Sequence, residues 1–186
     1  MTTSAPPSQF RSRLTLLLIA ALFLSSFGIA AALFFSGWTP GKGRNFGELL
    51  QPPPELGALQ LRAADGAAYP WAPEKNTWRM VVVPAPGCTL QCSRVLDALH
   101  RVWLSQGRKA GRIDVLWFGP LPEHAPSFAG LHVMQPEPRL ASALPEAARP
   151  DAVPVYLVDP GGFLALHYHA GFDPNGLRKD LGKLVK

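Results

Sequence analysis

The sequence predicts an α/β domain carried behind one N-terminal membrane-spanning helix, and two stretches support this prediction. The first is an uncharged apolar stretch within residues 14–36. At about 1.5 Å per residue it can cross a hydrocarbon core of about 30 Å. The second runs from residue 78 to residue 118, where two apolar segments flank a segment with helical periodicity. A strand, a helix and a second strand in this order are typical of a right-handed crossover in a parallel sheet.

The composition indicates one globular domain with an appendage. The chain has 186 residues, of which 47% are hydrophobic, with 20 prolines and 17 glycines. Such a chain can bury one ordinary core and contains many turns. The formal net charge is +5, but the lysines and arginines are scattered. Because nucleic-acid binding needs basic side chains clustered on one face, we expect no nucleic acid as a partner.

The apolar stretch divides the first part of the chain into three segments. Residues 1–13 are predicted to be a short cytoplasmic tail, residues 14–36 a transmembrane signal anchor, and residues 37–54 a linker rich in glycine and proline. Arg11 and Arg13 precede the anchor. The positive-inside rule therefore keeps the N-terminus in the cytoplasm and places the rest of the chain outside it.

A cleaved secretory signal is the alternative interpretation of this stretch. The apolar region of such a signal spans about 7–15 residues, which is shorter than the one found here, and no small-x-small cleavage site is evident. We therefore expect a single-pass protein of a bacterial inner membrane, with its C-terminal domain in the periplasm. Two cysteines in that compartment can be oxidised to a disulfide and reduced again only by dedicated partners.

Residues 55–186 are predicted to form the folded domain. Alternation at Leu59 to Leu61, followed by a turn at Ala64 to Gly66, indicates an N-terminal β-hairpin. The later elements are recognised by apolar runs, helical periodicity or flanking turn residues and are expected at residues 78–83 (strand), 92–107 (helix), 113–118 (strand), 131–134 (strand), 139–144 (helical turn), 153–158 (strand), 163–169 (strand) and 173–186 (helix). Asp173 is the expected N-cap of the last helix, with Pro174 at its first position.

Cys88 and Cys92, the two cysteines of the chain, form the candidate functional site. They follow a β-branched strand and a breaker cluster, and they stand where a helix begins. Free backbone N–H groups and the helix dipole at such a terminus favour thiolate over thiol. The thiolate is both the nucleophile in disulfide exchange and a ligand for soft metals. Cys88 is the candidate attacking thiol because it lies nearer the exposed terminus, and Cys92 the resolving one.

A purely structural disulfide is the alternative for this pair. A loop this short removes little entropy from the unfolded chain, so the bond would stabilise the fold only weakly. Residues four apart can still reach the Cα separation that a disulfide tolerates, about 4.4–6.8 Å. The same spacing suits chelation of one ion.

Other potential metal ligands are less informative. His167 and His169 alternate along a predicted strand and therefore share one face. Such a pair can bind a metal, although polar strand residues facing water are the commoner explanation. Met134 can supply a thioether to Cu(I), but a lone methionine in an apolar run is usually a core residue.

The order of elements resembles the thioredoxin-like fold, a central mixed sheet flanked by helices, over residues 55–186. The resemblance implies that Pro154, ahead of a late strand, is preceded by a cis peptide bond and lies against the cysteines. The spacing Cys-x-x-x-Cys resembles the Sco family, membrane-anchored proteins that deliver copper to the dinuclear copper site of cytochrome c oxidase or reduce its cysteines. The anchor, the hairpin and the turn at residues 156–162 also suit that family.

The chain departs from the Sco pattern at two positions. Ser93 stands where these proteins usually place a proline after the second cysteine. Residues 149–152 read Arg-Pro-Asp-Ala where the family carries a histidine ligand. Without that imidazole the site keeps two soft ligands, Cys88 and Cys92, which suffice for Cu(I) but are poor for Cu(II).

The sequence thus predicts a divergent Sco-like protein that assists assembly of the cytochrome c oxidase copper site. It would act by reducing the target's cysteines or by transferring Cu(I), with Cys88, Cys92 and Pro154 as its site residues. A general thiol–disulfide oxidoreductase for exported proteins is the first alternative. A non-catalytic tethered module with a structural disulfide is the second.

Overall fold

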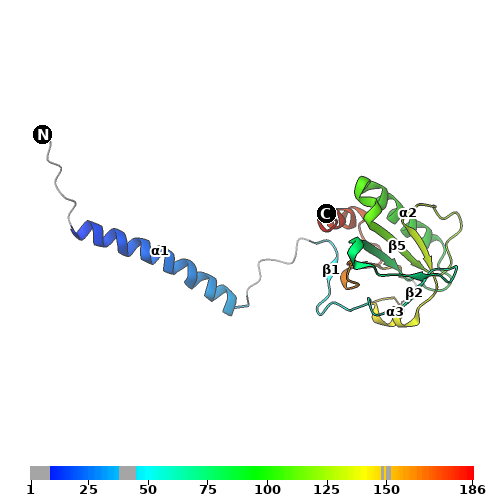
Figure 1. Cartoon of the computed structure of the whole chain (residues 1–186), viewed down its shortest axis with the longest axis horizontal. Helices are drawn as coiled ribbons and strands as arrows, with labels where there is room; N and C mark the ends of the chain where they lie inside the picture. Colours follow the sequence, from blue (N-terminus) through cyan, green and yellow to red (C-terminus); the bar gives the residue numbers. More distant parts are fainter. Residues whose placement is uncertain (1–8, 38–44, 148, 150–151) are drawn as a thin grey trace. The chain divides into compact units, whose positions relative to one another are not determined.

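The computed structural model describes residues 9–37, 45–147, 149 and 152–186, and the chain divides into the units Met1–Gly43 and Arg44–Lys186. In the first unit, helix α1 (Gln9–Phe35) forms the rod drawn in blue in Figure 1. Its segment Ser12–Phe35 is long and apolar enough to cross a membrane once. The expected apolar N-terminal helix is therefore present.

The second unit is built on a six-stranded mixed sheet. Three neighbouring strands run parallel, while β7 is antiparallel to β4, β8 to β7, and β1 to β8. Across the sheet the strands are β1 (Glu48–Leu49), β8 (Leu164–Tyr168), β7 (Val155–Val158), β4 (Trp78–Val82), β5 (Ile113–Phe118) and β6 (Leu131–Met134). The predicted α/β class and the parallel crossover from β4 to β5 are confirmed.

Helices cover both faces of this sheet (Figure 1). Alternate residues of each strand point to opposite faces, so the buried side chains separate into two clusters. Met80 and Val82 pack with α2 (Leu90–Ser105) and α4 (Pro174–Leu184). Val81 packs instead on the face that holds α3 (Pro138–Ala143). Two 3₁₀ segments, η1 (Pro73–Lys75) and η2 (Gly107–Arg112), complete the helical elements among the described residues.

The last helix begins as the sequence predicts. The Asp173 carboxylate accepts hydrogen bonds from the backbone N–H groups of Asn175 (2.9 Å) and Gly176 (3.2 Å), which caps two otherwise free donors. Pro174 occupies the first helical position, where its missing N–H costs no hydrogen bond.

The predicted hairpin is present as β2 (Leu61–Arg62) and β3 (Ala68–Tyr69), and it docks on the sheet through a polar network. The Tyr69 hydroxyl donates to Asp114 and accepts from Arg79 Nε (3.1 Å), while His132 Nε2 lies 3.4 Å from the other Asp114 oxygen. Burial alone would raise the pKa of Asp114, but the bonds from His132 and Tyr69 outweigh it and lower that pKa. Its carboxylate in turn raises the pKa of His132.

Strand β1 departs from the sequence prediction, which assigned residues 37–54 to the linker. Glu48 and Leu49 pair with His167 and Leu166 and extend the sheet by one strand. The backbone just before β1 is held by a residue far away in the sequence. The buried carboxylate of Asp180 accepts hydrogen bonds from the N–H groups of Phe46 (2.7 Å) and Gly47 (3.2 Å). A two-residue strand fixed by such contacts has no pattern of its own to recognise.

Candidate functional site

Cys88 and Cys92 form a disulfide at the start of α2. Their Cα atoms are 5.8 Å apart, within the range that the bond tolerates. Cys88 lies two residues before the helix and is half-buried, whereas Cys92 lies in the first turn and is only 1% exposed. Access from solvent is therefore greater at Cys88, the thiol expected to attack.

The loop before the helix holds Cys88 in place. Gly87 has a φ of 80°, in the left-handed region that favours glycine, and the N–H of Cys88 donates to the carbonyl of Ala85 (3.2 Å). Thr89 occupies the N-cap position, but its side chain makes no capping hydrogen bond there. The N–H groups of the first turn of α2 are thus not used by a side-chain cap, and a thiolate at this terminus would gain from them and from the helix dipole.

A pocket of about 420 Å³ opens beside the disulfide at the carboxyl ends of β4 and β5. Five prolines contribute to an apolar lining, and Glu137 is the single ionisable side chain among the described residues around it, disulfide-bonded cysteines aside. The lining residues are Val83, Pro84, Ala85, Pro86, Gly87, Cys88, Cys92, Phe118, Gly119, Pro120, Pro136, Glu137, Pro138 and Ala141. Such a surface offers mainly apolar contacts beside the disulfide.

The expectation of a cis bond before Pro154 is wrong. Among the described residues the one cis peptide bond joins Gln51 to Pro52, so the Val153–Pro154 bond is trans. Pro154 is buried directly before β7 and does not line the pocket beside the disulfide. Residue type and strand position matched the family pattern, but backbone isomer is decided by packing that a sequence does not display.

Three further side chains of types that can bind copper lie away from this pocket. His124 is on an exposed loop, His132 belongs to the hairpin network, and Met134 is 1% exposed within the core on the α3 face. None of the three lines the pocket. Asp151 lies outside the described residues. Among the described residues, the pocket therefore offers two sulfur atoms and one carboxylate.

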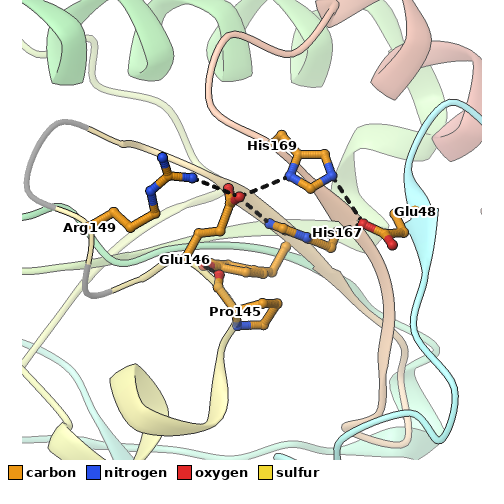
Figure 2. A network of polar contacts seen from close by, with 7 residues as sticks. Glu48, Pro145, Glu146, Arg149, His167 and His169 are labelled. Carbon is orange, nitrogen blue, oxygen red and sulfur yellow. Dashed lines mark hydrogen bonds and ion pairs between the residues drawn. The ribbon is translucent and has the colours of Figure 1, made fainter.

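His167 and His169 form a second polar site with two glutamates on the α3 face of the sheet (Figure 2). The commoner explanation of this pair, that both face water, is wrong for His167, which is 2% exposed and stacks on Tyr156 with ring centroids 5.2 Å apart. Burial, with the neighbouring His169, lowers the pKa of His167 in spite of two nearby carboxylates.

The carboxylates of this cluster come from segments far away in the sequence. Glu48 on β1 lies directly opposite His167 on β8, and Glu146 lies in the loop after α3. His169 Nε2 lies 3.0 Å from Glu48 Oε2, and His169 Nδ1 lies 3.3 Å from Glu146 Oε1. The His-x-His alternation was visible in the sequence, but nothing in it indicated which acidic residues would join the pair.

A mixed sheet with helices on both faces, and a cysteine pair where the first crossover helix begins, defines a thioredoxin-like protein. The family described as "transmembrane-like, thioredoxin-like, C-terminal domain" matches residues 78–186. The chain belongs to this family. A search of curated proteins found no match.

Solved structures that share the fold include members of the Sco family. BsSco, described as a cytochrome c oxidase assembly protein with a disulfide switch, is 12% identical over 75% of this chain and 96% of its own, with a TM-score of 0.56. Apo Sco1 of Thermus thermophilus is 14% identical over 78% and 98% (TM-score 0.53). ScoI of Arabidopsis thaliana with copper bound is 14% identical over 70% and 98% (TM-score 0.52). At these identities the likeness shows the fold.

Proposed function

We propose that the protein is a membrane-anchored thiol–disulfide oxidoreductase that reduces cysteines of an exported copper protein, the copper-site subunit of cytochrome c oxidase being the expected target. One observation carries the proposal: half-buried Cys88 opens on an apolar pocket while Cys92 stands buried behind it, within disulfide distance. This is the arrangement that an attacking and a resolving thiol require.

The exchange begins with both cysteines reduced. The Cys88 thiolate attacks one sulfur of the target disulfide, which forms a mixed disulfide and releases the first target thiolate. The Cys92 thiolate then attacks Cys88 Sγ, which releases the second target thiolate and forms the Cys88–Cys92 bond. Two electrons pass to the target, and a dithiol reductant outside the cytoplasm restores the starting state.

The segment assignment forms part of the proposal. Residues 1–13 would lie in the cytoplasm, residues 14–36 in the inner membrane, and the thioredoxin-like domain in the periplasm. One apolar helix of spanning length and the arginines before it support this topology. The edge strand β1 shortens the linker, because chain from Phe46 onward is bonded to the domain.

Transfer of Cu(I) is the second candidate function. The Cys-x-x-x-Cys spacing and the Sco structures with the same fold favour it. The two thiolates fit Cu(I), which is a soft ion that needs few ligands. They do not fit Cu(II), because no imidazole lines the pocket among the described residues. Copper in this reading is cargo rather than a resident cofactor.

The first experiment traps the mixed disulfide. The full-length Cys92→Ser variant in detergent, offered an oxidised peptide that contains a Cys-x-x-x-Cys disulfide, should form a covalent adduct through Cys88, detected by mass spectrometry. In the wild type, the Cys88–Cys92 couple should have a reduction potential above about −300 mV, whereas structural disulfides have potentials below that value. A lower potential together with no adduct would favour the structural disulfide instead.

A Cu(I) competition titration on the reduced protein, without oxygen, tests the second function. Binding of one ion, lost in the Cys88→Ser/Cys92→Ser variant, would support copper transfer. Equal loss of copper to the competitor from both proteins would remove copper transfer and leave thiol exchange as the function.

A further inference from the structure

The cluster on the α3 face brings three metal-ligating side chains together by strand geometry alone. His167 and His169 are two residues apart at the end of β8, so their imidazoles lie on one face, with ring centroids 4.5 Å apart. Glu48 is the cross-strand partner of His167 on β1. One ligand atom from each residue lies within 4.8 Å of the other two. Backbone pairing therefore fixes the relative positions of Glu48 and His167, and the alternation along the chain adds His169 on the same face.

The distances between these ligand atoms are close to those found around a bound metal ion. A tetrahedral zinc ion with bonds of about 2.0 Å separates its ligand atoms by about 3.3 Å. Glu48 Oε2 lies 3.0 Å from His169 Nε2 and 3.9 Å from His167 Nδ1. The first distance permits a hydrogen bond and the second does not. A cation between these three atoms would give each of them a partner.

His167 is buried, with its side chain 2% exposed, and its second ring nitrogen, Nε2, which would not bind the ion, has no hydrogen-bond partner among the described residues either. A buried polar atom left unpaired costs about 1–3 kcal/mol. This nitrogen faces Glu146 Oε2 at 3.8 Å, and Figure 2 shows Glu146 reaching toward both imidazoles. An ion on Nδ1 would fix the proton on Nε2, where it points at that carboxylate.

Glu146 completes the pattern as an outer carboxylate. It lies 3.3 Å from His169 Nδ1, the nitrogen turned away from Glu48, and it is held by Arg149 Nη1 at 3.1 Å. Imidazole ligands of metals usually donate their second N–H to such a carboxylate, which fixes the ring tautomer and orientation. Glu146 is thus placed to position both histidines rather than to bind the ion itself.

We propose that Glu48, His167 and His169 bind one divalent transition-metal ion of the zinc class on the α3 face, with Glu146 as their positioning residue. Two imidazoles and a carboxylate are borderline to hard ligands that suit Zn²⁺ and related ions, in contrast to the soft thiol pair. The side chains of His169 and Glu48 are 59% and 55% exposed, so a fourth position is open to water. This metal site shares no residue with the cysteine site and takes no part in the proposed thiol exchange.

The test is a Zn²⁺ titration against a chromophoric chelator, using the untagged full-length chain in detergent with its disulfide intact. The disulfide removes the thiols as ligands, so binding reports on this site alone. We expect one ion per chain, with affinity reduced at least tenfold in His169→Ala and in Glu48→Gln, and about 10–100-fold in Glu146→Gln. His124→Ala, which removes an exposed histidine elsewhere, should bind as the wild type does.

His169 and Glu48 are exposed, so their replacement should leave the fold intact, and thermal unfolding of each variant checks this. Amide exchange of Glu48 and Leu49 should slow when Zn²⁺ is added, because the ion joins β1 to β8. Absence of saturable binding, or equal binding by all variants, would overturn the proposal. Zn²⁺ binding that persists in Cys88→Ser/Cys92→Ser would support it whether or not the cysteines perform exchange.

Discussion

The disulfide pocket lies at the carboxyl ends of β4 and β5, whereas the histidine cluster lies on the α3 face of the sheet, and the two differ in their chemistry. The pocket is lined by apolar side chains and prolines, with one ionisable side chain, Glu137, among the residues that the structure describes, and its reactive atoms are sulfurs. The cluster is lined by two carboxylates and two imidazoles, one of them buried and unsatisfied. The Sco-type site that the sequence resembles joins two thiolates and an imidazole on one ion.

In this chain the soft ligands and the borderline ligands belong to two separate groups of side chains. The difference teaches that a shared fold and a shared cysteine spacing do not imply a shared site. Each half can accept a different partner, since thiolates favour Cu(I) or a disulfide whereas imidazole and carboxylate favour Zn²⁺. The following substitutions test how independent the two regions are.

Replacing both cysteines should have the largest effect and should affect only one region. In the Cys88→Ser/Cys92→Ser variant, peptide disulfide reduction should fall by at least about a thousandfold, because the nucleophile is absent. Zn²⁺ affinity should remain that of the wild type. A parallel loss of Zn²⁺ binding would show that the two regions are one site.

Asp180→Ala should loosen strand β1, which carries Glu48 of the cluster, from the rest of the domain. This buried carboxylate accepts from Phe46 N, Gly47 N and the Tyr168 hydroxyl (2.9 Å), and its removal leaves buried donors unpaired. We expect a loss of about 3 kcal/mol in the free energy of unfolding, measured by urea denaturation. Zn²⁺ affinity should fall as β1 loosens, while the reduction potential of the cysteines stays unchanged.

Asp173→Ala is the matched control for this change, since it alters the same helix without touching β1. Loss of the N-cap should cost only about 1 kcal/mol. Zn²⁺ affinity should be unaffected. Equal effects of the two variants on Zn²⁺ binding would mean that α4, rather than the hold of Asp180 on β1, supports the cluster.

The His132–Asp114 pair should make the free energy of unfolding depend on pH, and this effect should be smaller than the losses expected for Asp180→Ala and Asp173→Ala. The raised pKa of His132 contributes stability below 6.5 that is lost as the pH rises through the folded value, and the lowered pKa of Asp114 contributes stability above 3.8 that is lost on acidification. The wild type should exceed His132→Gln in unfolding free energy by less than about 1 kcal/mol at pH about 5.5, because the pair is partly exposed. That margin should shrink at pH about 8.5.

Glu137→Gln should have the smallest effect and should concern the pocket alone. Removing the one negative charge of the described lining should favour the Cys88 thiolate, and iodoacetamide should alkylate the reduced protein up to about threefold faster. Glutamine can still accept from the N–H of Arg139, so α3 should remain capped. Slower alkylation would indicate that Glu137 assists the thiol in some other way.

Local patterns predicted most of the fold. The apolar runs gave β4, β5 and β7, and the Asp173-Pro174 signal gave the start of α4, because these depend on nearby residues. Arg79, fully buried in β4, fitted no such pattern. Its charge is accommodated by Tyr69 and by the ring of Trp71, 4.9 Å from its Cζ, both from the hairpin.

The candidate sites also differ in whether nearby or distant residues determine them. Cys88 and Cys92 could be paired from the sequence because a four-residue separation at a helix start constrains them locally. The cluster could not, since Glu48, Glu146 and His167 meet only once β1 has joined the sheet. The isomer of the bond before Pro154 was missed for a similar reason: it depends on packing against distant residues.

The hold of Asp180 on Phe46 and Gly47 also determines how the domain bears mechanical load. A pull transmitted along the chain from α1 would reach the folded unit at these residues before it reached any strand of the sheet. Strand β1 lies at the sheet edge, where tension would separate its bonds to β8 one after another. The carboxylate, anchored by Tyr168 and Lys183, instead passes that tension into α4 and the core. Because α4 packs against α2 in the same core, a pull on the anchor would load the helix that carries Cys92.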